Sequence, residues 1–419
     1  MSQPTRILLS LVAGLALGIG AASLGWAGRL IPFSQPVGHL WLNALEMTII
    51  PLVMALVVTG IAATAEAANA GRTAARAIVT FIAMLWLFSV LAAVMVPLLL
   101  RAWPLGAAAA ANLRGALAGA KPVGTVPGFS DFLVGIVPTN AIAAAASDAF
   151  LPFIVFTLVF AFALTRLPAA QRAPLIALFE AIRDTMLVMI GWVLWIAPLG
   201  VFALAFTVGA QAGVAAFGAL IHYILIVSSV GVVIGLSGYP VAVIGGRVSF
   251  TRFARAVAPA QAVALSTESS LASLPAMLGG AEALGVPVAT AGVVLPLATA
   301  IFRATSPAMN LAVAIYVAYW FGVPLTVTSL VTGVAVAAIT TLGSVSLPGQ
   351  ISYVASIAPI CIAMGVPIAP LGLLVAVETL PDIVRTVGNV TMDLAVTAMV
   401  AARGPAAHLD EGDALLSEE

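Results

Sequence analysis

The stretch ETLPDIVRTVGNVTMD, residues 378–393, lies inside an apolar run that is long enough to span a membrane. It carries four ionisable side chains, which are Glu378, Asp382, Arg385 and Asp393. At 100° per residue, these side chains and Asn389 fall on one helix face, within an arc of roughly 80°. Ionisable groups are costly in hydrocarbon, so this face must contact protein or water. The stretch therefore predicts a helix that other helices of a membrane protein enclose.

The composition of the whole chain also indicates a polytopic membrane protein. Of its 419 residues 62% are hydrophobic and 8% are charged, and the mean hydropathy is +1.18. Sixteen basic residues balance sixteen acidic ones, so the net charge does not indicate a nucleic-acid partner. The single cysteine, Cys361, excludes an internal disulfide and argues against a cysteine-based metal site. The three scattered histidines do not suggest a metal cluster.

Six apolar runs fill the first part of the chain, at about 6–27, 38–64, 74–100, 131–165, 174–208 and 217–245. We expect helices there, because unpaired strand edges cannot face lipid. Most arginines follow alternate runs, so the positive-inside rule predicts that both termini are cytoplasmic. We expect a multi-pass protein of the plasma (inner) membrane. The Ala/Gly-rich segment 104–130 is then an external loop, and 404–419 a cytoplasmic tail.

After residue 257 the apolar segments become shorter and polar clusters interrupt them. These clusters are STESSLASLP at 266–275 and TTLGSVSLPGQIS at 340–352. Each lies between half-spans that are too short to cross the bilayer, which predicts two re-entrant helical hairpins. The hairpins, at about 257–287 and 326–368, alternate with spans at about 288–318 and 371–402. This order is an inverted repeat, and paired broken segments in inverted halves indicate a transport site near the midplane.

The polar face of the last span offers groups for an acidic substrate. The planar guanidinium of Arg385 can hold a carboxylate with two hydrogen bonds. Asp382 can receive an ammonium group, Asn389 can donate to a second carboxylate, and Thr386 can add a hydroxyl. The hairpin tips could add Ser269 and Ser270 from the first and Gly343 and Pro348 from the second. The alternatives are an ion pair of Arg385 with Asp382 or Glu378 that serves only packing, and a C4-dicarboxylate as the substrate.

Several motifs together resemble the dicarboxylate/amino acid:cation symporter family, the glutamate and aspartate transporters. They are PLVMALVVTG at 51–60, IVPTN at 136–140, APLGVFAL at 197–204, the two polar tips, and DIVRTVGNVTMD at 382–393. The resemblance implies an all-α elevator fold with eight transmembrane helices and two re-entrant hairpins, assembled as a homotrimer. It also implies that Arg385 holds the substrate side-chain carboxylate, Asp382 the amine and Asn389 the α-carboxylate.

The resemblance further implies a division into scaffold and transport domain. Residues 1–73 and 131–208 would form the scaffold, 74–103 and 209–403 the transport domain.

The seventh span departs from the family pattern for cation binding. The relatives carry Asn-Met-Asp-Gly-Thr in its unwound part, where this chain has Phe302, Arg303, Ala304, Thr305 and Ser306. Sodium needs several oxygen ligands, and a neighbouring arginine repels it. We therefore expect proton rather than full sodium coupling, although Asp393 and Asn389 remain candidate sodium ligands.

Four residues are candidates for coupling, namely Asp393, Glu268, Arg303 and Glu378. If Glu268 lies near Asp382, one of the two carboxylates would keep its proton near neutral pH. Arg303 stands in mid-span, too far from the interface to snorkel, so we expect it to replace a bound cation and to be neutralised by Asp393, Glu268 or the substrate.

The sequence thus predicts a secondary active transporter of a small anionic substrate, such as glutamate, aspartate or a dicarboxylate. No cofactor is expected beyond Na⁺ or H⁺ as the coupling ion. The alternatives are a sodium-coupled C4-dicarboxylate symporter and an uncoupled exchanger, channel or ligand sensor. An intramembrane enzyme with Glu268 and Asp382 as an acid/base pair is disfavoured, because the sequence has neither an HExxH motif nor a nucleophile paired with a base.

Overall fold

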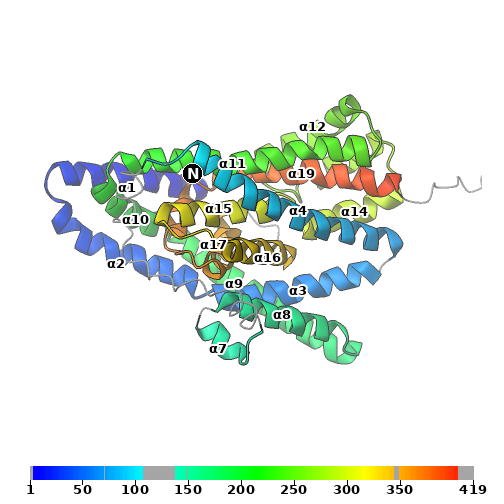
Figure 1. Cartoon of the computed structure of the whole chain (residues 1–419), viewed down its shortest axis with the longest axis horizontal. Helices are drawn as coiled ribbons and strands as arrows, with labels where there is room; N and C mark the ends of the chain where they lie inside the picture. Colours follow the sequence, from blue (N-terminus) through cyan, green and yellow to red (C-terminus); the bar gives the residue numbers. More distant parts are fainter. Residues whose placement is uncertain (1–2, 70, 107–136, 148, 344–348, 404–419) are drawn as a thin grey trace, which may run out of the picture.

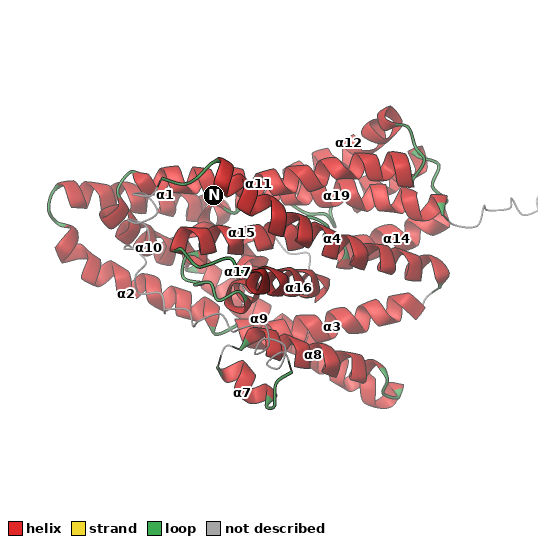
Figure 2. Cartoon of the chain, in the orientation of Figure 1, coloured by secondary structure: helices red, strands yellow, loops and turns green. Residues whose placement is uncertain are grey.

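The computed structural model describes residues 3–69, 71–106, 137–147, 149–343 and 349–403, and these parts of the chain are helical apart from short connections (Figure 2). A helix satisfies its own backbone hydrogen bonds, which is what a chain without water around it requires. Most of the long helices run side by side along the longest axis of the molecule (Figure 1). In the described residues, the predicted all-α architecture with long apolar helices is confirmed.

The first part of the chain forms the helices α1 (Gln3–Ser23), α2 (Ala27–Glu46), α3 (Ile49–Asn69), α4 (Arg72–Ala102), α7 (Ala141–Ala146), α8 (Phe150–Thr165), α9 (Ala169–Trp195) and α10 (Ala197–Ala212). Helix α1 packs on α10, and α10 packs on α2. At Gly18 of α1 an added Cβ would lie 2.2 Å from the carbonyl oxygen of Phe206. The two helices can therefore approach this closely only because that side chain is absent.

The second part of the chain contains α11 (Ala215–Pro240), the π-helical turn η1 (Val241–Gly245), α12 (Phe250–Thr267), α13 (Leu274–Ala283), α14 (Val288–Ile301), α15 (Ser306–Phe321), α16 (Val327–Gly343), α17 (Gly349–Ala363), α18 (Leu371–Leu374), the 3₁₀ turn η2 (Val375–Val377) and α19 (Thr379–Ala402). Helix α19 packs against α11, α12 and α14. Every residue from Gly388 to Val400 is buried, so α19 is an interior helix, as the opening stretch predicted.

Six helical segments among the described residues are long and apolar enough to cross a membrane, namely Thr5–Ser23, Ala27–Ala68, Arg72–Ala102, Ala215–Gly245, Val288–Phe321 and Thr379–Ala402. The pair α9 and α10, bent by 58° at their junction, would make a seventh. A Pro in the first turn of α10 accounts for a new helix beginning there. These segments overlap the predicted spans, although Ala27–Ala68 begins well before the predicted run 38–64.

The predicted apolar run 131–165 is not one continuous helix in the structure. Its described part consists of the short helix α7 and of α8, which has 16 residues. Asn140 begins α7, since its side-chain oxygen accepts hydrogen bonds from the backbone N–H groups of Ile142 and Ala143, both at 3.0 Å. The predicted external loop 104–130 lies almost wholly outside the described residues, and the predicted tail 404–419 lies entirely outside them.

Two helix pairs occupy the positions of the predicted hairpins. Helices α12 and α13 pack against each other, and so do α16 and α17. Helix α16 also contacts α3 and α4 of the first part of the chain and α15 of the second, so this pair lies between α3 and α15 (Figure 1).

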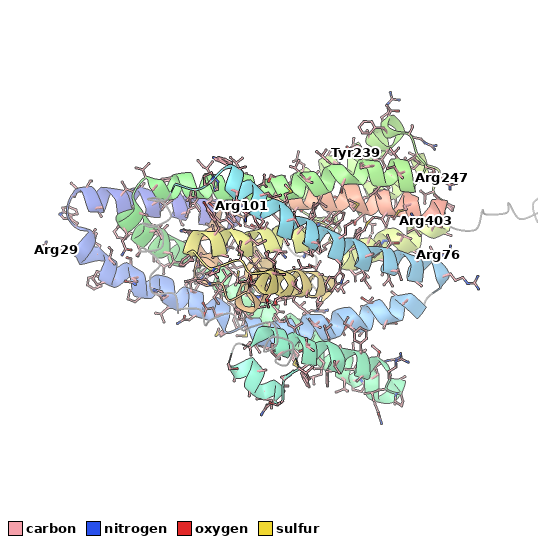
Figure 3. All side chains as sticks on the ribbon, in the orientation of Figure 1. Arg29, Arg76, Arg101, Tyr239, Arg247 and Arg403 are labelled. Carbon is pink, nitrogen blue, oxygen red and sulfur yellow. The ribbon has the colours of Figure 1, made fainter. Side chains whose placement is uncertain are left out.

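Arginine side chains mark the two ends of the long axis. Arg76, Arg247 and Arg403 lie near one end and Arg29 lies at the other (Figure 3). The side chain of Arg76 donates a hydrogen bond to the carbonyl oxygen of Arg403 at 3.2 Å, so the start of α4 meets the end of α19.

Candidate functional site

The N-terminal part of α19 holds a buried cluster of three charged side chains. One guanidinium nitrogen of Arg385, Nη1, donates to Oε1 of Glu378 at 2.5 Å and to Oδ1 of Asp382 at 2.7 Å. All three residues are at most 4% exposed. Residues three and seven positions apart face the same side of a helix, which is why the sequence brings these groups together.

Arg385 uses only part of its hydrogen-bonding capacity. Its Nε and Nη2 are buried and have no hydrogen-bond partner among the described residues. A buried donor without a partner costs free energy, and guanidinium donors are matched best by a carboxylate. The unpartnered edge of Arg385 is therefore suited to an anion that is held by two parallel hydrogen bonds.

Asn389 fastens α19 to the break between α14 and α15. Its side-chain oxygen accepts hydrogen bonds from the backbone N–H of Thr305 at 2.9 Å and from the Thr305 hydroxyl at 2.8 Å. The same hydroxyl lies 2.9 Å from the carbonyl oxygen of Arg385. These bonds occupy the side-chain oxygen of Asn389, so its NH₂ group is the part of the side chain that remains for a ligand, as a hydrogen-bond donor.

Arg303 lies in this break, and Asp382 is the carboxylate whose charge acts on it. The side chain of Arg303 is partly buried. The backbone N–H of Ser306 donates a hydrogen bond of 2.9 Å to the carbonyl oxygen of Arg303, which shapes the turn. The ring of Phe302 stacks on that of Phe81 from α4, with the ring centroids 4.4 Å apart. The unwound segment predicted at 302–306 is therefore present, and it brings a second arginine to the cluster on α19.

The first hairpin brings a further carboxylate toward Asp382. Glu268 ends α12 in a left-handed conformation, with φ of 52°, and its charge interacts with that of Asp382. Ser269 and Ser270 follow in the turn and are partly buried. The Ser269 hydroxyl accepts a hydrogen bond from the N–H of Ala272 at 3.2 Å, so it also supports the turn. This interaction indicates that Glu268 lies near Asp382.

The other residues named from the sequence are more scattered. Thr386 lies beside Arg385, and its hydroxyl donates to the carbonyl oxygen of Asp382 at 2.9 Å. Gly343 ends α16, whereas Pro348 lies outside the described residues. Asp393 is two turns beyond Arg385, roughly 12 Å along the helix at 1.5 Å per residue. It is fully buried, and neither of its carboxylate oxygens has a partner among the described residues.

A pair of tyrosines near Glu378 was not predicted. The hydroxyls of Tyr223 from α11 and Tyr353 from α17 lie 2.9 Å apart, and the charge of Glu378 acts on both. The available signal was a tyrosine in the middle of an apolar span, because a buried phenol usually has a hydrogen-bond partner. The sequence does not show which partner that is.

Gly388 permits the close packing around the cluster. An added Cβ there would lie 2.6 Å from Cγ2 of Thr305. At Gly235 of α11 an added Cβ would lie 3.1 Å from the Cα of Gly388. The absence of both side chains therefore lets the break and α11 meet α19.

Comparison of the sequence with models of protein families matches the sodium:dicarboxylate symporter family over residues 4–403. The chain belongs to this family. The family resemblance inferred from the motifs is confirmed, and so is the prediction of a transporter rather than an enzyme.

Individual relatives in the sodium:dicarboxylate symporter family divide between two kinds of substrate. The chain is 26% identical to the proton/glutamate-aspartate symporter of Escherichia coli (strain K12), over 94% of this chain and 91% of the relative. It is 25% identical to the C4-dicarboxylate transport protein of Laribacter hongkongensis (strain HLHK9), over 94% and 88%. It is 26% identical to the proton/sodium-glutamate symport protein of Bacillus subtilis (strain 168), over 92% and 89%.

Proposed function

We propose that this chain is a symporter that moves an acidic amino acid or a dicarboxylate across the plasma membrane, and that Arg385 binds the carboxylate. The observation that carries the proposal is the buried guanidinium of Arg385, whose Nε and Nη2 lack partners among the described residues. An arginine that served only to close the packing would be expected to use these donors within the protein. Asn389, Thr386 and the two hairpin tips would complete the site, with Ser269 and Ser270 in the first and Gly343 and Pro348 in the second.

The proposed architecture has eight transmembrane helices and two re-entrant hairpins. The pairs α12–α13 and α16–α17 would be the hairpins, and α8 with the residues before it would be the fourth span. Residues 1–73 and 131–208 would form a scaffold in a homotrimer, while 74–103 and 209–403 would move as a transport domain. The placement of the pair α16–α17 against α3 supports a contact between a moving hairpin and the scaffold.

Proton coupling is proposed over full sodium coupling. The break between α14 and α15 offers few side-chain oxygens, since Phe302 and Ala304 have none and Arg303 adds a positive charge. Glu268 and Asp382 interact, so one of them can carry a proton. Asp393 is fully buried without a partner in the described part of the chain, so it must be neutralised by a proton or a cation, and the backbone carbonyl of Asn389 would be the second ligand of a cation. Glu378, which pairs with Arg385, would be a further candidate for the coupling proton.

Uptake by the purified protein in liposomes tests this function. Radiolabelled aspartate, glutamate and succinate are supplied with an inward proton gradient, an inward sodium gradient, or neither. The proposal expects concentrative uptake of at least one of these anions with the proton gradient. Uptake that follows only the sodium gradient would contradict the coupling, and absence of any anion uptake would contradict the function.

A further inference from the structure

A second arginine in the candidate site has no role in the binding scheme described so far. Arg303 stands near the middle of the 34-residue segment Val288–Phe321, far from either end. A cation at that depth must be neutralised locally, because its side chain cannot reach the interface. The question is which charge neutralises it, and what that does to the substrate.

The backbone of the break fixes Arg303 next to the cluster on α19. The backbone N–H of Thr305, two residues further on, donates to Asn389, and the Thr305 hydroxyl lies 2.9 Å from the carbonyl oxygen of Arg385. Both Thr305 and Asn389 are buried. Two consecutive turns of α19 are thereby attached to the residues beside Arg303. This geometry keeps Arg303 close to the cluster.

The expected neutralising groups for Arg303 were Asp393, Glu268 or the substrate. Both oxygens of Asp393 lack a partner in the described part of the chain, and the acid whose charge acts on Arg303 is Asp382. Asp382 also accepts a hydrogen bond from Arg385. In the cluster, Arg303 and Arg385 balance Asp382 and Glu378 when both carboxylates are ionised, and Glu268 of the first hairpin adds no charge while it carries the proposed proton.

This balance changes what Asp382 can do for a ligand. A carboxylate that faces a single arginine can still attract an ammonium group, but one that two guanidinium groups neutralise attracts it weakly. An ammonium group brought to Asp382 would also be repelled by Arg303. A second carboxylate of the ligand, by contrast, would be attracted to Arg303.

We propose that Arg303 is a resident cation of the substrate site, which takes the place of a substrate ammonium group beside Asp382, so that the site selects dicarboxylates without an amino group. The inference rests on the proposed function, since it assumes that Arg385 binds a carboxylate of the substrate. It makes Arg303 a specificity-determining residue.

Succinate and L-aspartate are the matched probes, because aspartate is succinate with one amino group added. Calorimetry on the purified protein measures both affinities, and glutarate with L-glutamate repeats the comparison with one more carbon. We expect the wild-type protein to bind succinate more tightly than aspartate by about tenfold or more, since a nearby cation repels the ammonium group. Arg303→Met should reduce this ratio at least about tenfold, whereas Arg303→Lys should largely keep it.

Arg29→Met is the control, because it removes the same charge from an exposed position at one end of the molecule. It should leave the succinate-to-aspartate ratio unchanged. Arg303→Gln replaces Arg303→Met if the latter does not fold. The succinate-to-aspartate and glutarate-to-glutamate ratios of the wild-type protein test the inference without any variant.

The possible results separate the inference from the function on which it rests. Wild-type protein that binds aspartate as tightly as succinate would overturn the inference and leave the transport function intact. An unchanged ratio in a folded Arg303→Met protein would do the same. If neither anion binds, the proposed function itself fails, and this inference fails with it.

Discussion

The charged residues of α19 show what a linear pattern can and cannot predict. The helical spacing of Glu378, Asp382 and Arg385 placed them on one face, and the structure pairs them as that spacing allows. The same spacing predicted nothing about Thr305 and Tyr353, which reach the cluster from segments distant in sequence. Contacts within one helix follow from periodicity, whereas contacts between helices depend on packing that a single sequence does not encode locally.

Arg385→Ala should lower the affinity for succinate and aspartate by about a hundredfold or more, because truncating a buried charged partner leaves the ligand carboxylate unpaired. It also leaves Glu378 and Asp382 without their common partner. Calorimetry measures the effect. Arg385→Lys keeps the charge but loses the planar fork, so its affinity should lie between those of the wild type and the alanine variant. Unchanged affinity in a folded alanine variant would remove Arg385 from the binding site.

Glu268 makes the proposed proton coupling testable at a single side chain. It lies in the connection between α12 and α13, outside the six candidate spans. Burial and the carboxylate of Asp382 raise the pKa of Glu268 above its ordinary value. Because its pKa is raised, Glu268 binds a proton at a higher pH than an ordinary glutamate does. It can therefore take up a proton on the more acidic side of the membrane and release it on the less acidic side.

Uptake by Glu268→Gln should therefore no longer depend on an inward proton gradient, because the amide stays neutral at every pH. The wild-type protein and Glu282→Gln should keep the dependence, since Glu282 is an exposed carboxylate of the same hairpin. Liposome uptake at several internal and external pH values measures the difference. Full gradient dependence in Glu268→Gln would assign the proton to another group.

At the scale of whole helices, the sequence predicted where the membrane spans lie better than where helices are interrupted or bent. The run 288–318 was predicted from its apolar residues, whereas its unwound segment was expected only from the resemblance to the family. The break between α7 and α8 follows the polar residue Ser147, which the predicted run 131–165 passed over. The bend between α9 and α10 lies within an apolar run, where a hydropathy window cannot resolve it. The proline in the first turn of α10 was the one local signal for that bend.

The contact between α19 and the break can be tested at Gly388. Gly388→Ala would place a methyl group 2.6 Å from Cγ2 of Thr305, so α19 and the break would have to separate. We expect a loss of stability of about 1–3 kcal/mol, the usual cost of overpacking. Thermal unfolding in detergent measures it.

Gly292→Ala in α14 is the matched control, since an added Cβ there meets nothing within 4 Å. It should be neutral or stabilising by about 0.5–1 kcal/mol, because alanine favours the helix over glycine. Equal stability of the two variants would show that the contact between Gly388 and Thr305 is loose.

For the molecule as a whole, the distribution of arginines predicts its orientation in the membrane. Arg76 and Arg403 meet at one end of the long axis, and Arg29 lies at the other (Figure 3). The positive-inside rule places the end with Arg76 and Arg403 in the cytoplasm. Neither the helices nor their packing fix this direction, so it has to be measured on the membrane.

Cys361 is the single cysteine of the chain and it is buried, which makes labelling of introduced cysteines simple to interpret. In a Cys361→Ala background, Arg29→Cys should react with a membrane-impermeant maleimide on intact cells. Arg76→Cys and Arg403→Cys should react only after the membrane is permeabilised, because their end of the molecule faces the cytoplasm. The wild-type protein should stay unlabelled in both conditions, as the control. The reverse pattern would place the arginine-rich end outside, and labelling of all three variants on intact cells would mean that the two ends do not lie on opposite sides of the membrane.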